Sequence, residues 1–225
     1  MSLKAQLELC RSEYEANVEP HVIDAARRSV QSLAETGLVA KAVKAGEAAP
    51  LFRLRRGRRD FIDLANLLNH GPVVISFLRG TWCPYCVLEL QALAAAHPEI
   101  KRLGATLVAL SPQARTPSSS LSSEGGLPFP VLQDAGCKIA GRYRIVFTVP
   151  QEFRTAYLAL GYPRSLKAAS KDWVLPIPAT YVLDSAGLVT LSYLDADYTT
   201  RLEPTEIIVA LTQLRAATIP NRNNR

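Results

Sequence analysis

The sequence predicts an α/β protein in which a β-sheet is flanked by helices and preceded by a helical extension. From residue 46 onward, short apolar runs of strand type alternate with segments of helical spacing, whereas residues 3–44 show helical spacing alone. The chain has 225 residues, of which 48% are hydrophobic and 20% charged, so it can bury a substantial core and has the composition of a soluble globular protein.

The first 45 residues are expected to form two helices and a short tail. Pro20 interrupts the helical pattern, and Gly37 stands where the second helix should end. We expect this extension, residues 1–45, to pack on the core or on a second subunit, which could support a homodimer. Residues 46–217 then form the main domain, and the basic segment 218–225 is expected to be a flexible tail.

Four strands and three helices are predicted in the main domain. The strands are 73–78, 106–110, 180–183 and 189–194, and the helices are 84–96, 151–159 and 204–216. Pro98 disfavours helical geometry at His97 and is expected to end the first helix. A hairpin is predicted at 185–187, and the serine- and proline-rich segment 111–126 is predicted to be a loop.

The net charge of +6 raises the question of nucleic-acid binding. The basic residues gather at 53–59 and 222–225, and the first cluster surrounds Gly57 between short apolar runs. Aromatic residues that could stack on bases are not interleaved with it. We therefore expect the solvated turn of an exposed hairpin and no nucleic-acid partner, with an anionic partner or membrane surface as the alternative.

The sequence also bears on location. No apolar stretch approaches the length of a membrane span, and charged residues stand where a signal peptide would be apolar. Only four cysteines are present, two of them in a redox spacing. These features predict a cytoplasmic protein without membrane contact.

The motif Cys83-Pro84-Tyr85-Cys86 lies where a predicted strand gives way to a predicted helix. Pro84 suits the first helical position, which makes Cys83 the N-cap residue. Its sulfur should then be exposed and lie near free N–H groups at the positive end of the helix dipole. A thiolate is stabilised there and the thiol pKa falls. The motif therefore predicts a redox-active pair, Cys83 and Cys86.

Zinc binding and a purely structural disulfide are the alternatives for this motif. A closed zinc site needs four ligands, but there is no second Cys-X-X-Cys and none of the three histidines has ligand spacing. A structural disulfide explains neither Pro84 nor the position of the motif. We expect no metal and no cofactor. Cys137 is expected to be a buried small hydrophobe, or else a distant resolving thiol, and Cys10 a bystander, or else a link between subunits.

Four stretches carry a resemblance to a known family. They are FLRGTWCPYC at 77–86, GATLVALSP at 104–112, FPVLQD at 129–134 and LPIPATYVLDSAG at 175–187. Together they resemble peroxiredoxin-like members of the alkyl hydroperoxide reductase/thiol-specific antioxidant (AhpC/TSA) family, over about residues 46–215. The resemblance implies a thioredoxin-like fold with a central mixed sheet. It also implies an antioxidant thiol-dependent hydroperoxide reductase that cycles a Cys83–Cys86 disulfide.

The sequence departs from the family pattern at the reactive site. Peroxiredoxins place Pro-X-X-X-Thr-X-X-Cys around the attacking cysteine, and alignment puts Arg79, Cys83 and Cys86 at the three fixed positions. The peroxiredoxin arginine falls at Pro178, which resembles instead the cis-proline that faces the dithiol in thioredoxins. We therefore expect a cis Ile177–Pro178 bond against the dithiol. The alignment favours Cys86 as the attacking thiol and the N-cap position favours Cys83, so both stay open.

Other residues are candidates for supporting roles. The buried acid of thioredoxins falls at Ser76, so an internal proton acceptor is not evident. Trp82 and Tyr85 are expected to flank the sulfur, with plain core packing as the alternative. Arg79 could hold an oxyanion or lower a thiol pKa, although an ordinary surface arginine is favoured. Pro178 completes the candidate substrate contacts.

The expected partners follow from this chemistry. They are a hydroperoxide or disulfide substrate and a thioredoxin- or glutathione-type reductant. The alternative functions are a thioredoxin- or glutaredoxin-like disulfide oxidoreductase, and a binding protein that keeps the fold without turnover.

Overall fold

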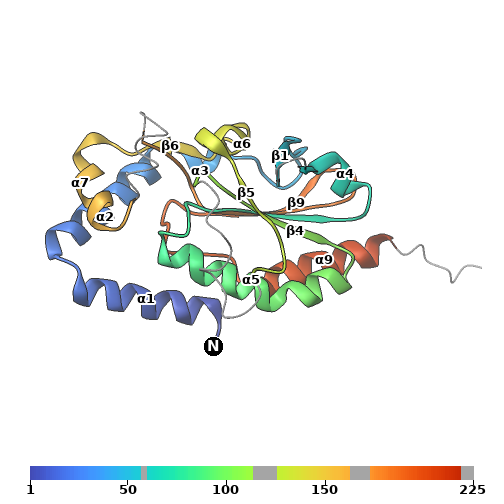
Figure 1. Ribbon diagram of the computed structural model, residues 1–225, viewed down its shortest axis with the longest axis horizontal. Coiled ribbons are helices and arrows are strands. Elements are labelled where there is room, and N and C mark those ends of the chain that lie inside the picture. The colour runs from blue at the N-terminus through green and yellow to red at the C-terminus, as the bar shows by residue number, and fades with distance from the viewer. Residues whose placement is uncertain (57–59, 114–125, 163–172, 219–225) are drawn as a thin grey trace, which may run out of the picture.

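The computed structural model describes residues 1–56, 60–113, 126–162 and 173–218. Its centre is a five-stranded mixed sheet with the order β5-β4-β3-β8-β9 (Figure 1). The strands are β3 (Val73–Phe77), β4 (Thr106–Ser111), β5 (Val131–Gln133), β8 (Ala179–Leu183) and β9 (Val189–Leu194). β4 and β5 run parallel to β3, whereas β8 is antiparallel to it and β9 is antiparallel to β8. The predicted mixed sheet is confirmed.

Helices cover both faces of this sheet. On one face lie α1 (Leu3–Asn17), α5 (Pro84–Arg102) and α9 (Pro204–Thr218); on the other lie α3 (Leu38–Lys41), α4 (Leu64–Leu68) and α6 (Lys138–Arg142) (Figure 1). At one end of the molecule α2 (Pro20–Glu35) contacts α7 (Arg154–Ala159), which follows the 3-10 turn Gln151–Phe153. Two short antiparallel pairs complete the fold: β1 (Arg53–Arg55) with β2 (Phe61–Asp63), and β6 (Val146–Thr148) with β7 (Val174–Pro176).

The central strand β3 shows why the sheet is buried on both sides. Val73, Ile75 and Phe77 join the hydrophobic cluster under α4 and α6, whereas Val74 and Leu78 join the cluster under α1, α5 and α9. Successive side chains of a strand point to opposite faces, so a continuous apolar run suits a strand that is covered on both faces.

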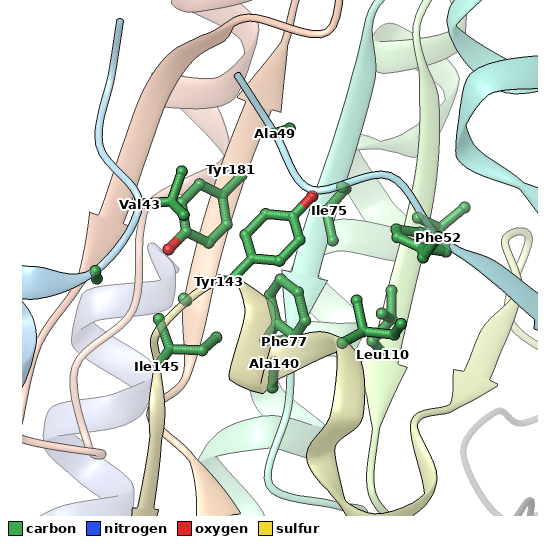
Figure 2. Packing of buried hydrophobic residues seen from close by; sticks show 14 of the residues in the cluster. Val43, Ala49, Phe52, Ile75, Phe77, Leu110, Ala140, Tyr143, Ile145 and Tyr181 are labelled. Atoms are coloured by element: carbon green, nitrogen blue, oxygen red, sulfur yellow. The ribbon is translucent and has the colours of Figure 1, made fainter. Parts of the chain in front are cut away.

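An aromatic group occupies the cluster on the α6 side (Figure 2). The ring centroid of Phe77 lies 4.9 Å from that of Tyr143 and 6.0 Å from that of Tyr181, and the two tyrosine rings are 5.0 Å apart. These tilted and edge-on contacts are favourable for aromatic pairs. They join β3, β8 and the end of α6 into one core.

The N-terminal extension packs on the core, which was one of the two predicted arrangements, the other being packing on a second subunit. Leu3 and Leu7 of α1 are buried in the cluster beneath α5. The backbone N–H groups of Leu3 and Lys4 donate to the Glu203 carboxylate, at 3.3 and 2.6 Å. Because the first N–H groups of a helix have no intrahelical partner, this carboxylate fixes the start of α1 beside α9.

The prediction that α5 ends before Pro98 is wrong, because the helix continues to Arg102 with Pro98 inside it. A proline within a helix costs about 3 kcal/mol through one lost hydrogen bond and a steric clash. The continuation buries Ile100 completely and most of Leu103. Burial of side chains of this size contributes about 1.5–3 kcal/mol each, which offsets the cost at Pro98.

The remaining element predictions agree with the fold, within a few residues at the ends. The basic segment 53–59 begins in β1, which pairs antiparallel with β2 just after the segment, as expected for a hairpin, although 57–59 lie outside the described residues. Most of the predicted loop at 111–126 and nearly all of the basic tail also lie outside them. None of the helices in the described part of the chain is both long and apolar enough to span a bilayer.

We predict that Phe77→Ala lowers the free energy of unfolding by about 3–5 kcal/mol, because a buried phenylalanine is lost from the ring cluster. Phe61→Ala is the matched control. Phe61 is 41% exposed beneath the Arg53 guanidinium, so its loss should cost about 1 kcal/mol or less. Urea denaturation of the two variants measures the difference, and equal losses would contradict the placement of Phe77.

Candidate active site

The dithiol lies at the start of α5, directly beyond the end of β3. Cys83 has extended backbone angles (φ −94°, ψ 114°), and its carbonyl accepts hydrogen bonds from the N–H groups of Cys86 and Val87 at 3.0 and 3.2 Å. Pro84 occupies the first helical turn. The prediction that Cys83 is the N-cap residue and Pro84 begins the helix is therefore confirmed.

The loop between β3 and Cys83 needs glycine at position 80. Gly80 has φ 142°, and a Cβ there would lie 2.5 Å from Gln113 Oε1 and 2.6 Å from the Trp82 ring. The Thr81 N–H donates to the same Gln113 oxygen at 2.7 Å. Gln113, two residues after the end of β4, thus holds the loop that precedes Cys83.

Both thiols are free and both are buried, with Cys83 2% and Cys86 0% exposed. The expectation of an exposed N-cap sulfur is wrong. The cavity beside Cys83 holds about 10 Å³, room for roughly one water molecule. Side chains from four elements close it: Tyr14 of α1, Tyr85 of α5, Leu160 after α7 and Tyr198 after β9.

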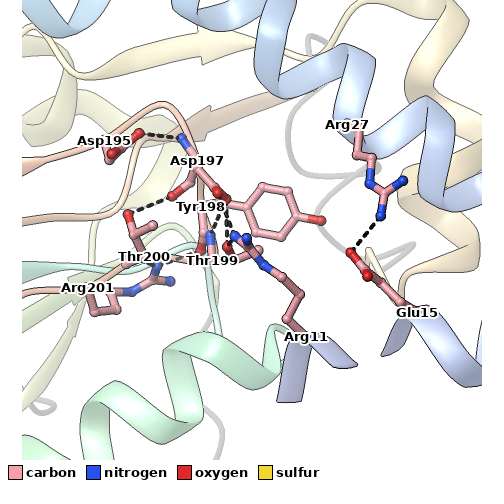
Figure 3. Close-up of polar contacts among 9 residues, drawn as sticks. All are labelled: Arg11, Glu15, Arg27, Asp195, Asp197, Tyr198, Thr199, Thr200 and Arg201. Carbon is pink, nitrogen blue, oxygen red and sulfur yellow. Dashed lines mark hydrogen bonds and ion pairs between the residues drawn. The ribbon is translucent and has the colours of Figure 1, made fainter. Parts of the chain in front are cut away.

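Helix α1 is held over this cavity by polar contacts. Arg11 reaches from α1 to the loop after β9, where its guanidinium lies 2.5 Å from the Asp197 carboxylate and contacts Thr199 (Figure 3). The Tyr14 ring lies 6.2 Å from the Tyr85 ring. The extension is therefore part of the wall of the site.

The pKa values of the two thiols are shifted in opposite directions. Burial alone would raise the pKa of Cys83, but a hydrogen bond from Cys86 and the charges of Arg79 and Arg201 outweigh it and lower the pKa to about 6. Burial, together with the hydrogen bond to Cys83 and its charge, raises the pKa of Cys86 well above the ordinary thiol value. Near neutral pH the site therefore holds one thiolate, on Cys83, beside one thiol.

Arg201 is a site residue that the sequence did not reveal. It is buried at the loop before α9, and its Nη2 donates to the Cys86 sulfur at 3.2 Å. Its Nε pairs with the carboxylate of Glu89, and its Nη1 donates to the Tyr198 and Thr200 carbonyls, each at 2.5 Å. Every arm of the guanidinium is engaged, so its position against the dithiol is fixed.

Glu89 is the second residue that sequence reasoning missed. It lies almost one helical turn after Cys86, its side chain is 2% exposed, and its Oε1 accepts a hydrogen bond from Ser76 at 2.7 Å. Burial raises the pKa of Glu89 to about 7, and the Arg201 charge and the Ser76 hydroxyl oppose a larger rise. Where thioredoxins carry their acid, this chain has Ser76, which instead binds an acid from α5.

Arg79 is buried, only 2% exposed, so the favoured interpretation as a surface arginine is wrong. Its guanidinium carbon lies 4.1 Å from the ring centroid of Tyr198, 4.8 Å from that of Trp82 and 5.1 Å from that of Tyr157. Its Nε and Nη1 are buried without a hydrogen-bond partner. Arg79 is therefore a buried cation in contact with three aromatic rings, and it lines the Cys83 cavity with two N–H donors that have no acceptor.

The two aromatic candidates combine both of their predicted roles. Trp82 and Tyr85 line the Cys83 cavity. Trp82 also donates from its indole N–H to the Arg79 carbonyl at 3.2 Å and packs edge-on against Tyr162. Tyr85 is buried and packs edge-on against Tyr198, 5.8 Å between centroids.

The expected cis bond before Pro178 is wrong, since no cis peptide bond occurs in the described residues. The Ile177 N–H donates to the Ile145 carbonyl at 2.7 Å, and β8 begins at Ala179, so pairing on both sides keeps the chain extended there. Pro178 lines a small cavity with Arg79, and Cys83 is not among its lining residues.

The other two cysteines are free thiols outside the Cys-X-X-Cys motif. Cys137 is 3% exposed, and burial followed by the nearby Asp134 charge raises its pKa to about 12, so its prediction as a buried small hydrophobe is confirmed. Cys10 is half-buried on α1 and lines a groove with Trp82 and Pro84. No cluster of three or more potential metal ligands among His, Cys, Asp and Glu occurs in the described ranges.

Comparison with known proteins places this site in a family. Residues 45–192 match the model of the AhpC/TSA family, so the chain belongs to that family. It is similar to chloroplastic peroxiredoxin Q of Populus jackii, with 27% identity over 151 residues that cover 67% of this chain and 60% of that protein. It is also similar to the thiol-disulfide oxidoreductase ResA of Bacillus anthracis, with 32% identity over 101 residues that cover 44% of this chain and 57% of that protein.

Solved structures show the same fold. The chain is similar to a peroxiredoxin 6 mutant from Arenicola marina with a TM-score of 0.61 and 18% identity, covering 78% of this chain and 76% of that one. The peroxidoxin BcpB of Mycobacterium tuberculosis gives a TM-score of 0.56 and 20% identity, covering 77% and 97%. The predicted thioredoxin-like, peroxiredoxin-type fold is thus confirmed.

We predict that Glu89→Gln lowers the free energy of unfolding by about 3–5 kcal/mol, because it leaves the buried Arg201 charge without its carboxylate. Glu99→Gln on the same helix is the matched control. Glu99 pairs with Arg102 at 2.6 Å, but its side chain is 39% exposed, so its loss should cost at most about 1 kcal/mol. Chemical denaturation of the reduced proteins tests both, and a Glu89 variant as stable as the control would contradict the buried network.

Proposed function

We propose that the protein is a thiol-dependent hydroperoxide reductase that cycles Cys83 and Cys86 between dithiol and disulfide. The observation that carries this proposal is the thiolate-stabilising environment of Cys83, next to a protonated Cys86 and two buried guanidinium groups. Membership of the AhpC/TSA family supports it. Cys83 is the attacking thiol and Cys86 the resolving thiol.

The reaction has two steps. The Cys83 thiolate attacks the terminal peroxide oxygen, the O–O bond breaks, and the leaving alkoxide takes up a proton, which leaves a sulfenic acid on Cys83. The Cys86 thiol then attacks that sulfur, which forms the disulfide and releases water. Two electrons and two protons from a thiol reductant restore the dithiol.

The arginines compensate for the missing peroxiredoxin residues. Pro178 and Cys83 occupy the places of the family's arginine and threonine, but Arg79 and Arg201 bring positive charge to the dithiol from other parts of the chain. The open Nε and Nη1 of Arg79 are available donors for a developing oxyanion. Trp82, Tyr85 and Arg79 are the proposed substrate contacts in the cavity, and Pro178 contributes through Arg79.

Disulfide exchange is the second candidate function. It is favoured by the position of the two cysteines in the first turn of one helix, because the nearby Cys86 thiol can attack a mixed disulfide formed on Cys83. The cavity of about 10 Å³ favours the small peroxide over a protein disulfide while α1 is in place. We propose one site with both activities, with the peroxide as its principal oxidant.

The cellular setting is also a proposal. A thioredoxin- or glutathione-type reductant, a cytoplasmic location and an antioxidant role fit a chain with four cysteines of which two form the redox motif. A homodimer remains a prediction.

We predict that Cys86→Ser captures a mixed disulfide with a thiol partner, because the resolving thiol is missing, whereas Cys83→Ser captures none. Mass spectrometry after incubation with an activated disulfide measures the adduct. Cys137→Ser is the matched control and should behave like the wild type, since that thiol is buried and has a raised pKa. Capture by Cys83→Ser in place of Cys86→Ser would assign the attack to Cys86.

Peroxide consumption tests the principal activity. In stopped-flow experiments the reduced protein should consume hydrogen peroxide about 100-fold to 1,000-fold faster than free cysteine at the same pH, the factor that one positioned donor to a developing oxyanion typically contributes. The Cys83→Ser variant should lose this rate. A wild-type rate equal to that of free cysteine would leave disulfide exchange as the remaining enzymatic function.

A further inference from the structure

The buried charges around the dithiol do not balance once it is oxidised. Arg79 and Arg201 are two cations that are almost fully buried, and Glu89 is the one carboxylate bonded to either of them among the described residues. In the reduced protein the Cys83 thiolate supplies the second negative charge. Disulfide formation removes that charge and leaves a buried site with a surplus of positive charge.

Arg79 is the cation left without a counter-ion. The structure gives it no ion pair within the described part of the chain. Burial lowers the pKa of Arg79, but the phenols of Tyr157 and Tyr198 and the two active-site thiols outweigh burial and raise it. Aromatic faces attract a buried cation, but they carry no net negative charge to balance it. A buried charge with no ionic partner is strongly destabilising, so the Cys83 thiolate is the group that supplies the opposite charge for Arg79.

We propose that the Cys83 thiolate is the counter-ion of Arg79 and that this pairing makes the Cys83–Cys86 disulfide a strong oxidant, which low-molecular-weight monothiols can reduce. The inference rests on the redox-active dithiol of the proposed function and names its reductant class and the residue that sets its equilibrium. Any interaction that favours the reduced form over the disulfide shifts thiol-disulfide exchange toward reduction of the enzyme.

The balanced exchange shows the driving force. The enzyme disulfide and two molecules of a monothiol, such as glutathione, give the enzyme with one thiol and one thiolate, one monothiol disulfide and one proton. The S–S bond of the enzyme is broken and reduced by two electrons, which come from oxidation of the two monothiol molecules as their own S–S bond forms. The negative charge appears on Cys83, beside Arg79.

The equilibrium constant of this exchange is the direct test. The full-length protein is equilibrated with mixtures of reduced and oxidised glutathione at neutral pH. Free thiols are then alkylated, and the reduced and oxidised fractions are measured by mass spectrometry. Arg79→Met should lower the constant for enzyme reduction at least tenfold, which corresponds to about 30 mV. Arg79→Lys keeps the charge and should restore most of the wild-type value, a recovery that a packing role alone would not produce.

Arg154→Met is the matched control. Arg154 also lies over an aromatic ring, that of Trp173 at 5.2 Å, but it does not line the Cys83 cavity. Its replacement should leave the constant unchanged. An Arg79→Met constant equal to that of the wild type, or an equal shift in Arg154→Met, overturns the proposal.

A measurement on the wild type covers the case in which Arg79→Met fails to fold. A disulfide ordinarily stabilises a protein by constraining its unfolded state. Here the reduced wild type should have the higher urea midpoint, because oxidation strips Arg79 of its counter-ion, and a more stable oxidised form overturns the proposal. Peroxide consumption is measured separately. A strongly oxidising disulfide in a protein that does not react with peroxide would contradict the proposed peroxidase activity but not this inference.

Discussion

The structure of the site depends on the burial of two guanidinium groups beside a dithiol, of which only Arg201 is paired with a carboxylate, Glu89, among the described residues. Arg201 is fixed by Glu89, by two carbonyls and by the Cys86 sulfur, while Arg79 is enclosed by aromatic rings. Charges of this kind are tolerated in a protein interior only where opposite charge is supplied. The low pKa of Cys83 follows from that constraint, whereas burial raises the pKa values of Cys86 and Glu89 against the opposing charge of Arg201.

The fold supplies this arrangement from distant parts of the chain. The loop after β3 carries Arg79, α5 carries the cysteines and Glu89, and the loop before α9 returns Arg201 to the first turn of α5. The N-terminal extension then closes the site from outside through Tyr14 and the Arg11–Asp197 pair. Exclusion of water strengthens every electrostatic contact beneath it, so α1 contributes to the chemistry as well as to the core.

Local signals allowed much of this to be predicted from the sequence. Pro84 after Cys83 was enough to predict the N-cap, because the chemistry of a helix start involves neighbouring residues only. The same local reasoning failed at Pro98, where burial of Ile100 by tertiary packing outweighs the bias against helix. It also failed at Pro178, whose backbone is governed by strand pairing on either side.

The charged network could not be predicted, because its contacts join residues far apart in the chain. Glu89 and Arg201 are separated by 112 positions, and no spacing rule links them. One signal was present: Glu89 falls on the face of α5 that also carries Leu90 and Leu93, and an acid on an apolar face needs a buried partner. Arg79 offered no comparable signal, since its burial follows from rings in two other segments, Tyr157 and Tyr198, together with Trp82 in its own loop.

The central claim is that the reduced site holds one thiolate, on Cys83, near neutral pH. A titration of the ultraviolet thiolate absorbance of the reduced protein tests it most directly, with Cys83→Ser and Cys86→Ser titrated in parallel. The account predicts one thiolate with a midpoint at about pH 6 in the wild type, and its loss in Cys83→Ser. A midpoint near the ordinary thiol value of about 8.5, or a low-pH thiolate that survives in Cys83→Ser, would contradict it.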